Sequence, residues 1–532
     1  MFYEYDYKSI ENKNPKLTKK CVWATIVDDG IIKNKGGSFT CAYEFIAPDI
    51  SSASRSKIDF ISTMFNNSLV QLGENWTIQI ELQRRMNNNY PTSKKWDSIT
   101  GLILDRQREI NFSYAKAHYH NRYFLIFTKK SETLIDKKTK QLFFKNNSSK
   151  TNKLEEDVLN ELQEIKDFKT KTDNVVSILR TVMNIDFLDS ERLLTLLHSQ
   201  VSMNWHKMAI PDDGKLIIDR VITEENLQNS IPMKLGNYYI PIVSIKAFPS
   251  QTYSAMMDQM NKADCEFRWS TRFMCYSHED TMHRLNNAEK RFHAKLQSMG
   301  QYIMGAFTHV ESTRINQTAA AQENEVAQAK IEVTMGNIGF GDYTSEIQVW
   351  DEDIDRAKEK AQYIANIATA TGFSTVHETL NSLSAWTSMQ AGNIFANQRE
   401  LFVSTSNVSH AVPFSSIWAG MINNNFMQEI SGEGLPHVVC DTEFGIPFFL
   451  NLNVGDVGHT WISGKTGAGK STLLATLEAQ WLKYPKSQII IFDKDRSARN
   501  LTICAGGTYI EPGKDKVTFQ PLAEIDTVKG KN

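Results

Sequence analysis

Eight consecutive residues in the last quarter of the sequence have the types and spacing that bind a polyphosphate. They fit the pattern G-x-x-x-x-G-K-[ST] and are Gly464, Lys465, Thr466, Gly467, Ala468, Gly469, Lys470 and Ser471. The three glycines allow backbone conformations that are closed to other residues, so that successive N–H groups can point at an anion at close range. The sequence therefore predicts a phosphate-binding loop (P-loop) here.

The side chains that follow the last glycine suit a nucleotide bound with magnesium. Lys470 is expected to reach the β- and γ-phosphates as a point charge, and the Ser471 hydroxyl to complete the coordination of Mg²⁺. Thr472 is expected near the α-phosphate. ATP and Mg²⁺ are therefore the expected cofactors, and Ser471 is the expected metal-binding residue.

The residues on either side of the motif also suit a P-loop, which normally lies between a strand and a helix. Residues 459–463 read as a short strand, and residues 472–481 read as a helix with Leu473, Leu474, Leu477 and Trp481 on one apolar face. The N-terminus of that helix adds unpaired N–H groups and a positive dipole end. The alternative is a chance match in a glycine turn before an ordinary helix.

Length, charge and cysteine usage limit the class of protein. A chain of 532 residues is expected to hold roughly three domains. Its 59 basic and 61 acidic residues give a net charge of −2, so DNA contact is expected to be local or indirect at most. The six cysteines lack paired or metal-type spacing, which suits reduced thiols in a cytosolic protein. Cys275, His278 and His283 could be considered as metal ligands, but a closed structural site needs a fourth ligand, which is missing here.

The sequence contains no apolar run of the ~18 residues that crossing a membrane requires, and its first residues do not resemble a signal peptide. We therefore expect a protein that is soluble or peripheral to a membrane. The Lys-, Asn- and Ser-rich residues 129–153 are either a solvated loop or a basic patch for an anionic membrane or nucleic acid. Because no aromatic residues that could stack on bases are interleaved with the lysines, we favour the solvated loop.

The region before the P-loop alternates strands and helices. Residues 76–83 alternate apolar and polar side chains, as in a strand with one buried face, and residues 343–350 do the same. Asp351 and Asp353 are expected to open a helix that ends near Gly372. This order predicts an α+β N-terminal region with ferredoxin-like subdomains and long helices, followed by an incomplete α/β domain.

The expected divisions follow the chain in order. They are an N-terminal α+β domain at 1–204, a second α+β domain with long helices at 205–422, a linker at 423–435 and a partial P-loop NTPase domain at 436–532.

Several segments around and before the P-loop resemble the TrbE/CagE family of conjugative and type IV secretion ATPases. The resemblance is specific at residues 451–460, the P-loop, residues 491–497 (IFDKDRS) and residues 519–523 (FQPLA), and it is looser before residue 200. Residues 351–353 (DED) and residues 378–386 also resemble that family. One departure is Ala391-Gly392-Asn393, where the family commonly has Pro-Gly.

The resemblance implies a RecA-like motor that forms hexamers at the cytoplasmic face of the bacterial inner membrane. Such a motor couples ATP to pilus assembly and to the transfer of DNA or protein. Its N-terminal region docks on the inner-membrane secretion channel, and coupling proteins are further expected partners. Whether DNA or protein is the substrate is left open by the sequence.

The acidic site that hydrolysis needs is not evident. Ile489-Ile490-Ile491-Phe492-Asp493 has four apolar residues and an Asp, but it lies on the first expected strand after the P-loop helix, whereas the family's acidic pair lies on a later strand. Asp493 is therefore either a catalytic acid or a strand-end residue that starts a turn. Only 62 residues follow Lys470 (532 − 470), so the sequence reads like a chain that ends midway through a motor domain. ATPase activity is thus uncertain, and the alternative is a truncated or decayed product that docks on the channel without hydrolysing ATP.

Overall fold

The computed structural model describes the chain over six ranges, namely residues 17–114, 116–130, 150–210, 216–290, 325–396 and 398–516, with side chains from residue 159 in the third. Contacts divide the chain into two compact units. Unit 1 consists of Met1–Arg85 with His120–Ile417, and unit 2 of Met86–Tyr119 with Trp418–Asn532. Each unit is thus assembled from segments that are separate in sequence. The three consecutive domains and the linker expected above stay a prediction.

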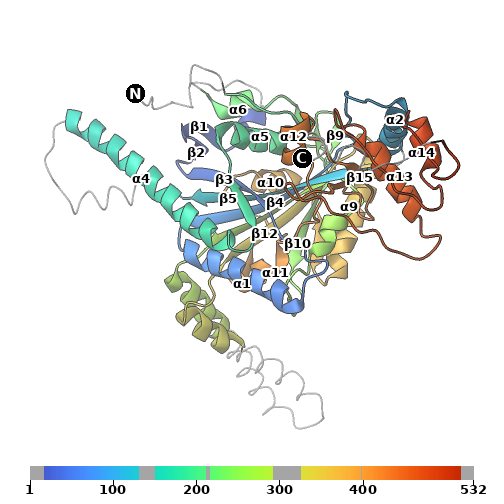
Figure 1. Cartoon of the computed structure of the whole chain (residues 1–532). Helices are drawn as coiled ribbons and strands as arrows, with labels where there is room; N and C mark the ends of the chain where they lie inside the picture. The colour runs from blue at the N-terminus through green and yellow to red at the C-terminus, as the bar shows by residue number, and fades with distance from the viewer. Residues whose placement is uncertain are drawn as a thin grey trace, which may run out of the picture. The chain divides into compact units, whose positions relative to one another are not determined.

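Unit 1 is built on an eleven-stranded antiparallel sheet (Figure 1). Its strands follow the order β1, β2, β3, β5, β4, β11, β12, β10, β13, with β6 beside β3 and β14 beside β12. The bounds are β1 Trp23–Asp28, β2 Ile31–Asn34, β3 Phe39–Ile46, β4 Trp76–Met86, β5 Tyr119–Lys129, β6 Asn184–Phe187, β10 Ile242–Ala247, β11 Phe267–Cys275, β12 Phe340–Val349, β13 Ser374–His377 and β14 Leu401–Ser404.

Both regions that the sequence analysis expected to be separate α+β domains, residues 1–204 and residues 205–422, contribute strands to this one sheet. Strand β4 pairs with β11, with Ile80 opposite Thr271, and β11 in turn pairs with β12 along its whole length. The fold is therefore a mixed α/β arrangement around an antiparallel sheet. A small second sheet of β7 (Leu227–Gln228), β8 (Lys234–Leu235) and β9 (Tyr238–Tyr239) completes the strands described in this unit.

Helices cover both faces of the large sheet (Figure 1). One face packs against α1 (Arg55–Leu72), α4 (Lys150–Leu179), α9 (Ile354–Ala370) and α11 (Thr405–Ala411). The other packs against α5 (Ser190–Val201), α6 (Ile218–Val221) and α10 (Ser382–Ser388). On β5, Leu125 and Phe127 enter the first core and Phe124 and Ile126 the second, as the two-residue period of a strand requires.

The expected helix signals are confirmed at α9, and α5 begins with the same kind of cap. The Asp353 side chain accepts hydrogen bonds from the backbone N–H groups of Asp355 and Arg356, and α9 ends just before Gly372, which has a φ of 94°. Asp189 caps α5 through the N–H group of Arg192, 2.8 Å away. A short carboxylate thus satisfies N–H groups that the first turn leaves unpaired.

The strand predicted at residues 76–83 is formed as β4, but both of its faces are buried. Its polar residues Gln79, Glu81 and Gln83 are buried, because α5 and the end of α10 cover that face. The Glu81 carboxylate accepts hydrogen bonds from Arg268 Nε at 3.0 Å and from Gln200 at 2.8 Å. Buried charges persist when they are paired and fully hydrogen-bonded, so an alternating pattern concealed an internal polar layer.

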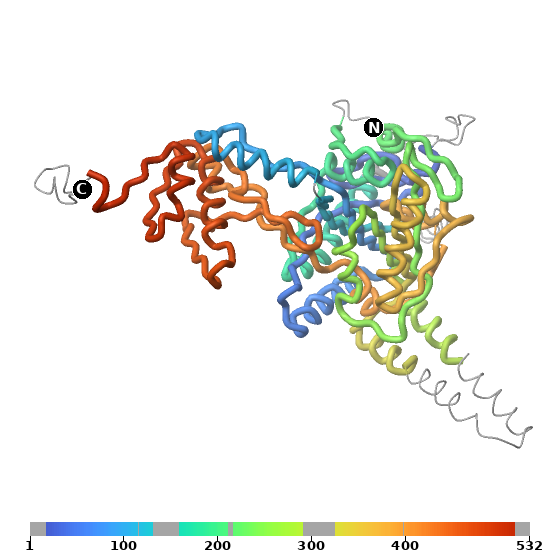
Figure 2. The backbone as a smooth tube through the Cα atoms, turned by 90° about the vertical axis from the view of Figure 1, so that its right-hand side faces the viewer, coloured from blue at the N-terminus to red at the C-terminus, as the bar shows by residue number. Residues whose placement is uncertain are grey.

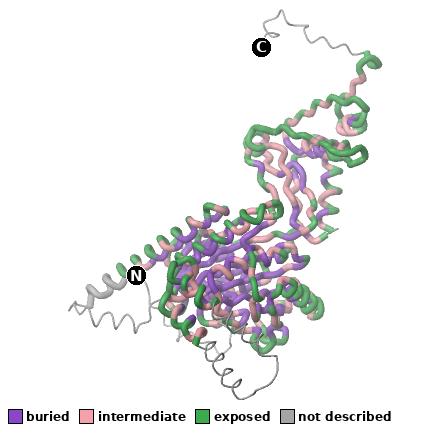
Figure 3. The backbone as a smooth tube through the Cα atoms, turned by 90° about the horizontal axis from the view of Figure 1, so that it is seen from below, coloured by how far each residue is buried: buried purple, intermediate pink, exposed green. Residues whose placement is uncertain are grey.

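Unit 2 carries the P-loop and is smaller. Its elements are α2 (Ile99–Tyr114), α12 (Asn425–Ser431), the antiparallel pair β15 (Val438–Cys440) and β16 (Phe448–Leu450), α13 (Lys470–Trp481) and α14 (Arg499–Cys504). Figure 2 shows α2, from the first quarter of the chain, beside the C-terminal segments of this unit. The sheet of unit 1 is largely buried, whereas much of the C-terminal region of unit 2 is exposed (Figure 3). None of the helices in the described ranges combines the length and apolarity needed to cross a bilayer.

Candidate functional site

The predicted P-loop is an exposed turn that leads directly into α13. Gly469 occupies the N-cap position of this helix with φ 84° and ψ 11°, and Gly467 has a φ of 81°. Both values lie in the left-handed region that glycine adopts without strain. Beyond the glycine itself and its neighbours in the chain, no heavy atom comes within 4 Å of the position where a Cβ would stand at either glycine. The turn therefore leaves open space at the start of the helix, where an anion is favoured.

Lys470 is the first residue of α13, and its side chain folds back over the loop. Its Nζ donates hydrogen bonds to the carbonyl oxygens of Gly464 at 2.8 Å and Lys465 at 2.7 Å. These carbonyl acceptors are neutral, so a phosphate oxygen, being charged, would form a stronger bond with the ammonium group. Lys470 thus lies across the loop in hydrogen bonds that a phosphate group could replace.

The hydroxyl groups of Ser471 and Thr472 complete the predicted site. Both residues are exposed on the first turn of α13. Within the ranges that the structure describes, neither hydroxyl makes a hydrogen bond. The two groups are therefore free to coordinate a cation or to donate to an oxyanion, and the residues present fit a nucleotide with Mg²⁺.

Three buried polar residues that the sequence analysis missed hold the far end of α13. The ring Nε2 of His437 lies 2.8 Å from the Leu477 carbonyl oxygen. Lys483 Nζ donates to the carbonyl oxygens of Pro436 and His437, each at 2.9 Å, and the Tyr484 hydroxyl donates to that of Leu435 at 2.9 Å. These bonds join the end of the helix to the segment that enters β15. Nothing in the sequence indicates that Lys483, which follows the apolar helix, is buried.

Burial shifts the protonation of two of these groups. It lowers the pKa of His437 to about 4, against a smaller opposing effect from the Leu477 carbonyl. It also lowers the pKa of Lys483 to about 8. Both shifts follow from the cost of holding a charge away from water. His437 is thus neutral at physiological pH and donates from Nε2.

The two strands expected around the P-loop are not formed. Residues 459–463 and 489–493 belong to no sheet, because no described strand lies beside either of them. Trp461 and Phe492 are 89% and 97% exposed. The apolar face expected on α13 is likewise buried only at Leu477, while Leu473 and Leu474 stay exposed. Side chains of core type therefore face solvent around the loop.

A large hollow lies between α13 and the segments that follow it. Its volume is about 1290 Å³, and its lining includes Glu478, residues 487–494 and residues 507–512. Burial raises the pKa of the Glu478 carboxyl, and the negative charge of Asp493 adds to that effect. Three carboxyl groups, those of Glu478, Asp493 and Glu511, thus line this hollow beside the P-loop helix, and that of Glu511 is paired with Arg496 and Lys514.

Asp493 organises the turn that follows it. Its carboxylate accepts hydrogen bonds from the N–H groups of Ala498 at 2.9 Å and Asp495 at 3.2 Å, and from the Ser497 hydroxyl at 3.1 Å. The N–H of Ala498 contributes most to the lowered pKa of this carboxyl. This geometry corresponds to the turn-starting role, in which the oxygens that a catalytic acid would offer are already engaged.

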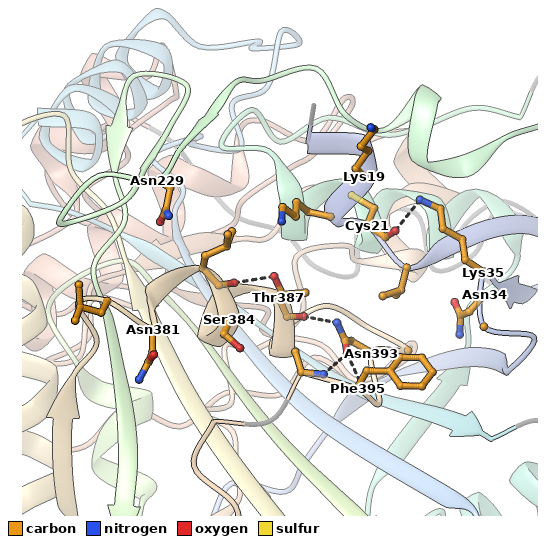
Figure 4. Close-up of a pocket in the computed structure, with 17 residues that line it drawn as sticks. Lys19, Cys21, Asn34, Lys35, Asn229, Asn381, Ser384, Thr387, Asn393 and Phe395 are labelled. Atoms are coloured by element: carbon orange, nitrogen blue, oxygen red, sulfur yellow. Dashed lines mark hydrogen bonds between the residues drawn. The ribbon is translucent and has the colours of Figure 1, made fainter. Parts of the chain in front are cut away.

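A second cavity of about 600 Å³ lies in unit 1 (Figure 4). Lys35 Nζ points to the Cys21 carbonyl oxygen at 2.8 Å and also pairs with Asp219 at 2.6 Å. Asn393 donates to the Thr387 carbonyl oxygen at 2.9 Å. Because Lys35 and Asn393 are already engaged in these bonds, they offer a ligand less than the hydroxyl groups of Ser471 and Thr472 do.

Two expected features fall outside the described residues: most of the basic segment, at residues 131–149, and the family-like segment at residues 519–523.

Comparison with protein families matches two regions of the chain. Residues 30–134 match the N-terminal domain of the type IV secretion system ATPase VirB4/TrbE, and residues 160–399 match the CagE, TrbE, VirB family, component of type IV transporter system. The chain belongs to this family. The resemblance stated from the sequence is therefore confirmed. Both matched ranges lie before the P-loop.

Individual relatives agree. The conjugal transfer protein TrbE of Rhizobium radiobacter is 27% identical over 540 residues, which cover 98% of this chain and 65% of that protein. A probable conjugal transfer protein TrbE of Sinorhizobium fredii is 29% identical over 353 residues, 63% of this chain and 51% of that protein. The type IV secretion system protein virB4 of Bartonella quintana is 23% identical over 296 residues, 55% of this chain and 34% of that protein. The chain spans less than two thirds of each of these relatives.

Proposed function

We propose that this chain is the ATP-binding component of a type IV secretion or conjugation machine. The observation that carries the proposal is the open turn of Gly467 and Gly469 at the start of α13, with Lys470 folded over it. The names of its relatives, conjugal transfer protein TrbE and type IV secretion system protein virB4, support the system to which it belongs.

In this proposal the residues Gly464 to Thr472 surround the phosphates. The N–H groups of the turn and of the first turn of α13 point at the β- and γ-phosphates. Lys470 would donate to phosphate oxygens in place of its two carbonyl acceptors, and Ser471 would hold Mg²⁺, which would neutralise phosphate charge. His437 and Lys483 keep the far end of α13 in position. Unit 2 then represents a portion of a RecA-like domain, whose further strands would cover Trp461 and Phe492.

The wider setting follows the family. We propose a location at the cytoplasmic face of the bacterial inner membrane, contact with the secretion channel and its coupling proteins, and assembly into a homo-hexamer. ATP would then drive pilus assembly and transfer of DNA or protein. The net charge of −2 supports a DNA contact that is only indirect or local. The division into two N-terminal α+β domains with ferredoxin-like subdomains belongs to the same proposal.

A second candidate function is a scaffold that binds the channel and does not hydrolyse ATP. It is favoured by Asp493, whose carboxylate bonds with its own turn and is not directed to the P-loop. In this case the chain alone binds nucleotide without turnover.

Two assays on the purified chain test these functions. In calorimetry with Mg²⁺, ATP is expected to bind the wild type and to lose affinity about 10- to 150-fold in Lys470→Ala, which corresponds to one charge-assisted hydrogen bond. Lys486→Ala, an exposed lysine of the same unit, is the matched control and should bind normally. Phosphate release then separates the functions: turnover that Lys470→Ala abolishes supports the motor, and binding without turnover supports the scaffold.

A further inference from the structure

Two histidines and a glutamate converge in unit 1, far along the chain from the P-loop. His198 lies in the last turn of α5, His206 in the loop that follows and Glu224 shortly after α6. One ligand atom from each, an imidazole nitrogen or a carboxylate oxygen, lies within 4.8 Å of the other two. The rings of His198 and His206 have centroids 4.4 Å apart. This set of donors is the kind that binds divalent transition metals.

The distances within the cluster are too long for hydrogen bonds and close to those around a metal. His198 Nε2 lies 3.9 Å from Glu224 Oε2, and His206 Nε2 lies 3.7 Å from Glu224 Oε1. Ligands held tetrahedrally at a typical zinc bond length stand about 3.4 Å from one another. A rotation of the exposed His206 and Glu224 side chains would bring all three to that separation.

His198 is the observation that calls for a ligand. Its side chain has no solvent exposure, and neither ring nitrogen has a hydrogen-bond partner among the described residues. Leaving a buried polar group unpaired is costly, so native structures nearly always supply a partner. His206 and Glu224 are about half exposed, so an ion can reach the inward-facing nitrogen from solvent. A bound ion would satisfy His198 directly.

The loop between the histidines is held in place by its own bonds. The Met203 N–H donates to the Glu225 carboxylate at 2.9 Å, and the Met208 N–H donates to the Thr195 hydroxyl at 3.0 Å. These bonds tie both sides of His206 to α5 and to the segment that carries Glu224. A site whose ligands are held beforehand loses less entropy on binding.

The charges nearby are balanced. The Arg85 guanidinium donates to the Ser199 carbonyl oxygen at 3.0 Å and packs over the ring of Trp205, 5.1 Å from its centroid. Its positive charge disfavours a second cation and helps to lower the pKa of His198, after the larger effect of burial. Against it stand the carboxyl groups of Glu224 and Glu225, which together attract a cation.

We propose that His198, His206 and Glu224 bind a divalent transition metal ion of the zinc class. Two neutral imidazoles and one carboxylate provide three ligands, and water fills the remaining position. The ion would link the end of α5 to the segment after α6. This site is independent of nucleotide binding by the P-loop.

The test is a zinc titration of the full chain after removal of metal with a chelator. Calorimetry is expected to give one Zn²⁺ per chain, and the thermal midpoint is expected to rise with Zn²⁺ concentration. His206→Ala and Glu224→Gln alter exposed side chains and are each expected to weaken binding by about 100-fold or more, since even indirect partners of a metal contribute 10- to 100-fold. His377→Ala, an exposed histidine on β13, is the matched control and should bind as the wild type does.

Absence of saturable binding, or equal affinity in the wild type and both variants, would overturn the site. X-ray absorption of the Zn²⁺-loaded wild type gives a test that does not depend on a variant folding. It should show nitrogen and oxygen ligands with imidazole scattering. Sulfur ligands would show that cysteines hold the ion and would also refute the proposal.

Discussion

Acidification should loosen the P-loop helix through one histidine. His437 has an ordinary pKa of 6.5 and a folded-state pKa of about 4, chiefly because it is buried. Between these values the unfolded chain binds a proton that the folded chain does not bind, so stability rises with pH and falls as the pH drops. From pH 6.5 down to about pH 5 the cost is roughly 1.36 kcal/mol for each pH unit, or about 2 kcal/mol in total.

The loss should appear locally in α13, because His437 donates to the carbonyl oxygen of Leu477 in that helix. Hydrogen–deuterium exchange of α13 peptides, corrected for the intrinsic effect of pH, measures the opening free energy at about pH 7.5 and about pH 5. We expect it to fall by ~2 kcal/mol in the wild type. In His437→Gln the amide can still donate but does not titrate, so the fall should disappear.

Other groups titrate in the same range with the opposite sign. Burial raises the pKa of Glu346 to about 7, so this group favours the folded state as the pH drops from about 7 toward 4.5. It is present in both the wild type and His437→Gln, and the difference between the two isolates the histidine. His377→Gln serves as the exposed control. Parallel pH profiles in the wild type and His437→Gln would refute the assignment.

Three further substitutions test other regions of the structure. Arg268→Met leaves the buried carboxylate of Glu81 without its charged partner and should destabilise unit 1 by about 3–5 kcal/mol in urea denaturation. The control Arg356→Met breaks an ion pair whose arginine is 65% exposed and should cost under about 1 kcal/mol. Equal costs for the two variants would contradict this expectation. Gly392→Ala adds a Cβ at a residue with a φ of 79°, and this Cβ would lie 2.7 Å from the Asn34 and Thr40 side chains. We expect the free energy of unfolding to fall by about 2–4 kcal/mol in thermal unfolding. An unchanged thermal midpoint would contradict this prediction. Asp493→Ala removes the carboxylate that accepts the hydrogen bonds of the 493–498 turn. Proteolysis at this turn should become faster, while ATP affinity should change by less than about twofold. A large loss of ATP affinity would instead place Asp493 in the nucleotide site.

The local signals of this sequence predicted local structure well. Asp353 and Gly372 delimit α9 as expected because capping depends on residues within one turn of the helix. The 343–350 pattern likewise predicted β12. Such features are set by neighbours in sequence and need no knowledge of the rest of the fold.

Features that depend on distant contacts were not predictable. Glu81 reads as a solvent-facing residue of an alternating strand, and only Arg268 and Gln200, more than a hundred residues away, explain its burial. The convergence of His198 and Glu224 requires α5 and α6 to be packed on the sheet. Likewise, residues 86–119 join unit 2 although residues 120–417 separate them from the rest of that unit, and no composition shift marks the boundaries of this segment.

The P-loop motif predicted a glycine turn entering a helix, and the structure has that turn at Gly467 and Gly469. The motif could not predict that residues 459–463 and 489–493 stand outside any sheet. A short apolar run indicates only that a segment can pair, and pairing requires a neighbouring strand.

The most direct test of nucleotide binding is a series of ligands that differ only in their phosphates. In the proposed site a nucleotide would be contacted by the amides of the turn, Lys470 and Ser471, so affinity should depend on phosphate number and on Mg²⁺. Calorimetry of the full chain with AMP, ADP and ATP is expected to give the tightest binding for ATP, weaker binding for ADP and little for AMP, with the order lost in Lys470→Ala. Equal affinity for all three nucleotides, or no binding of ATP to folded protein, would contradict the proposal that this loop binds a triphosphate.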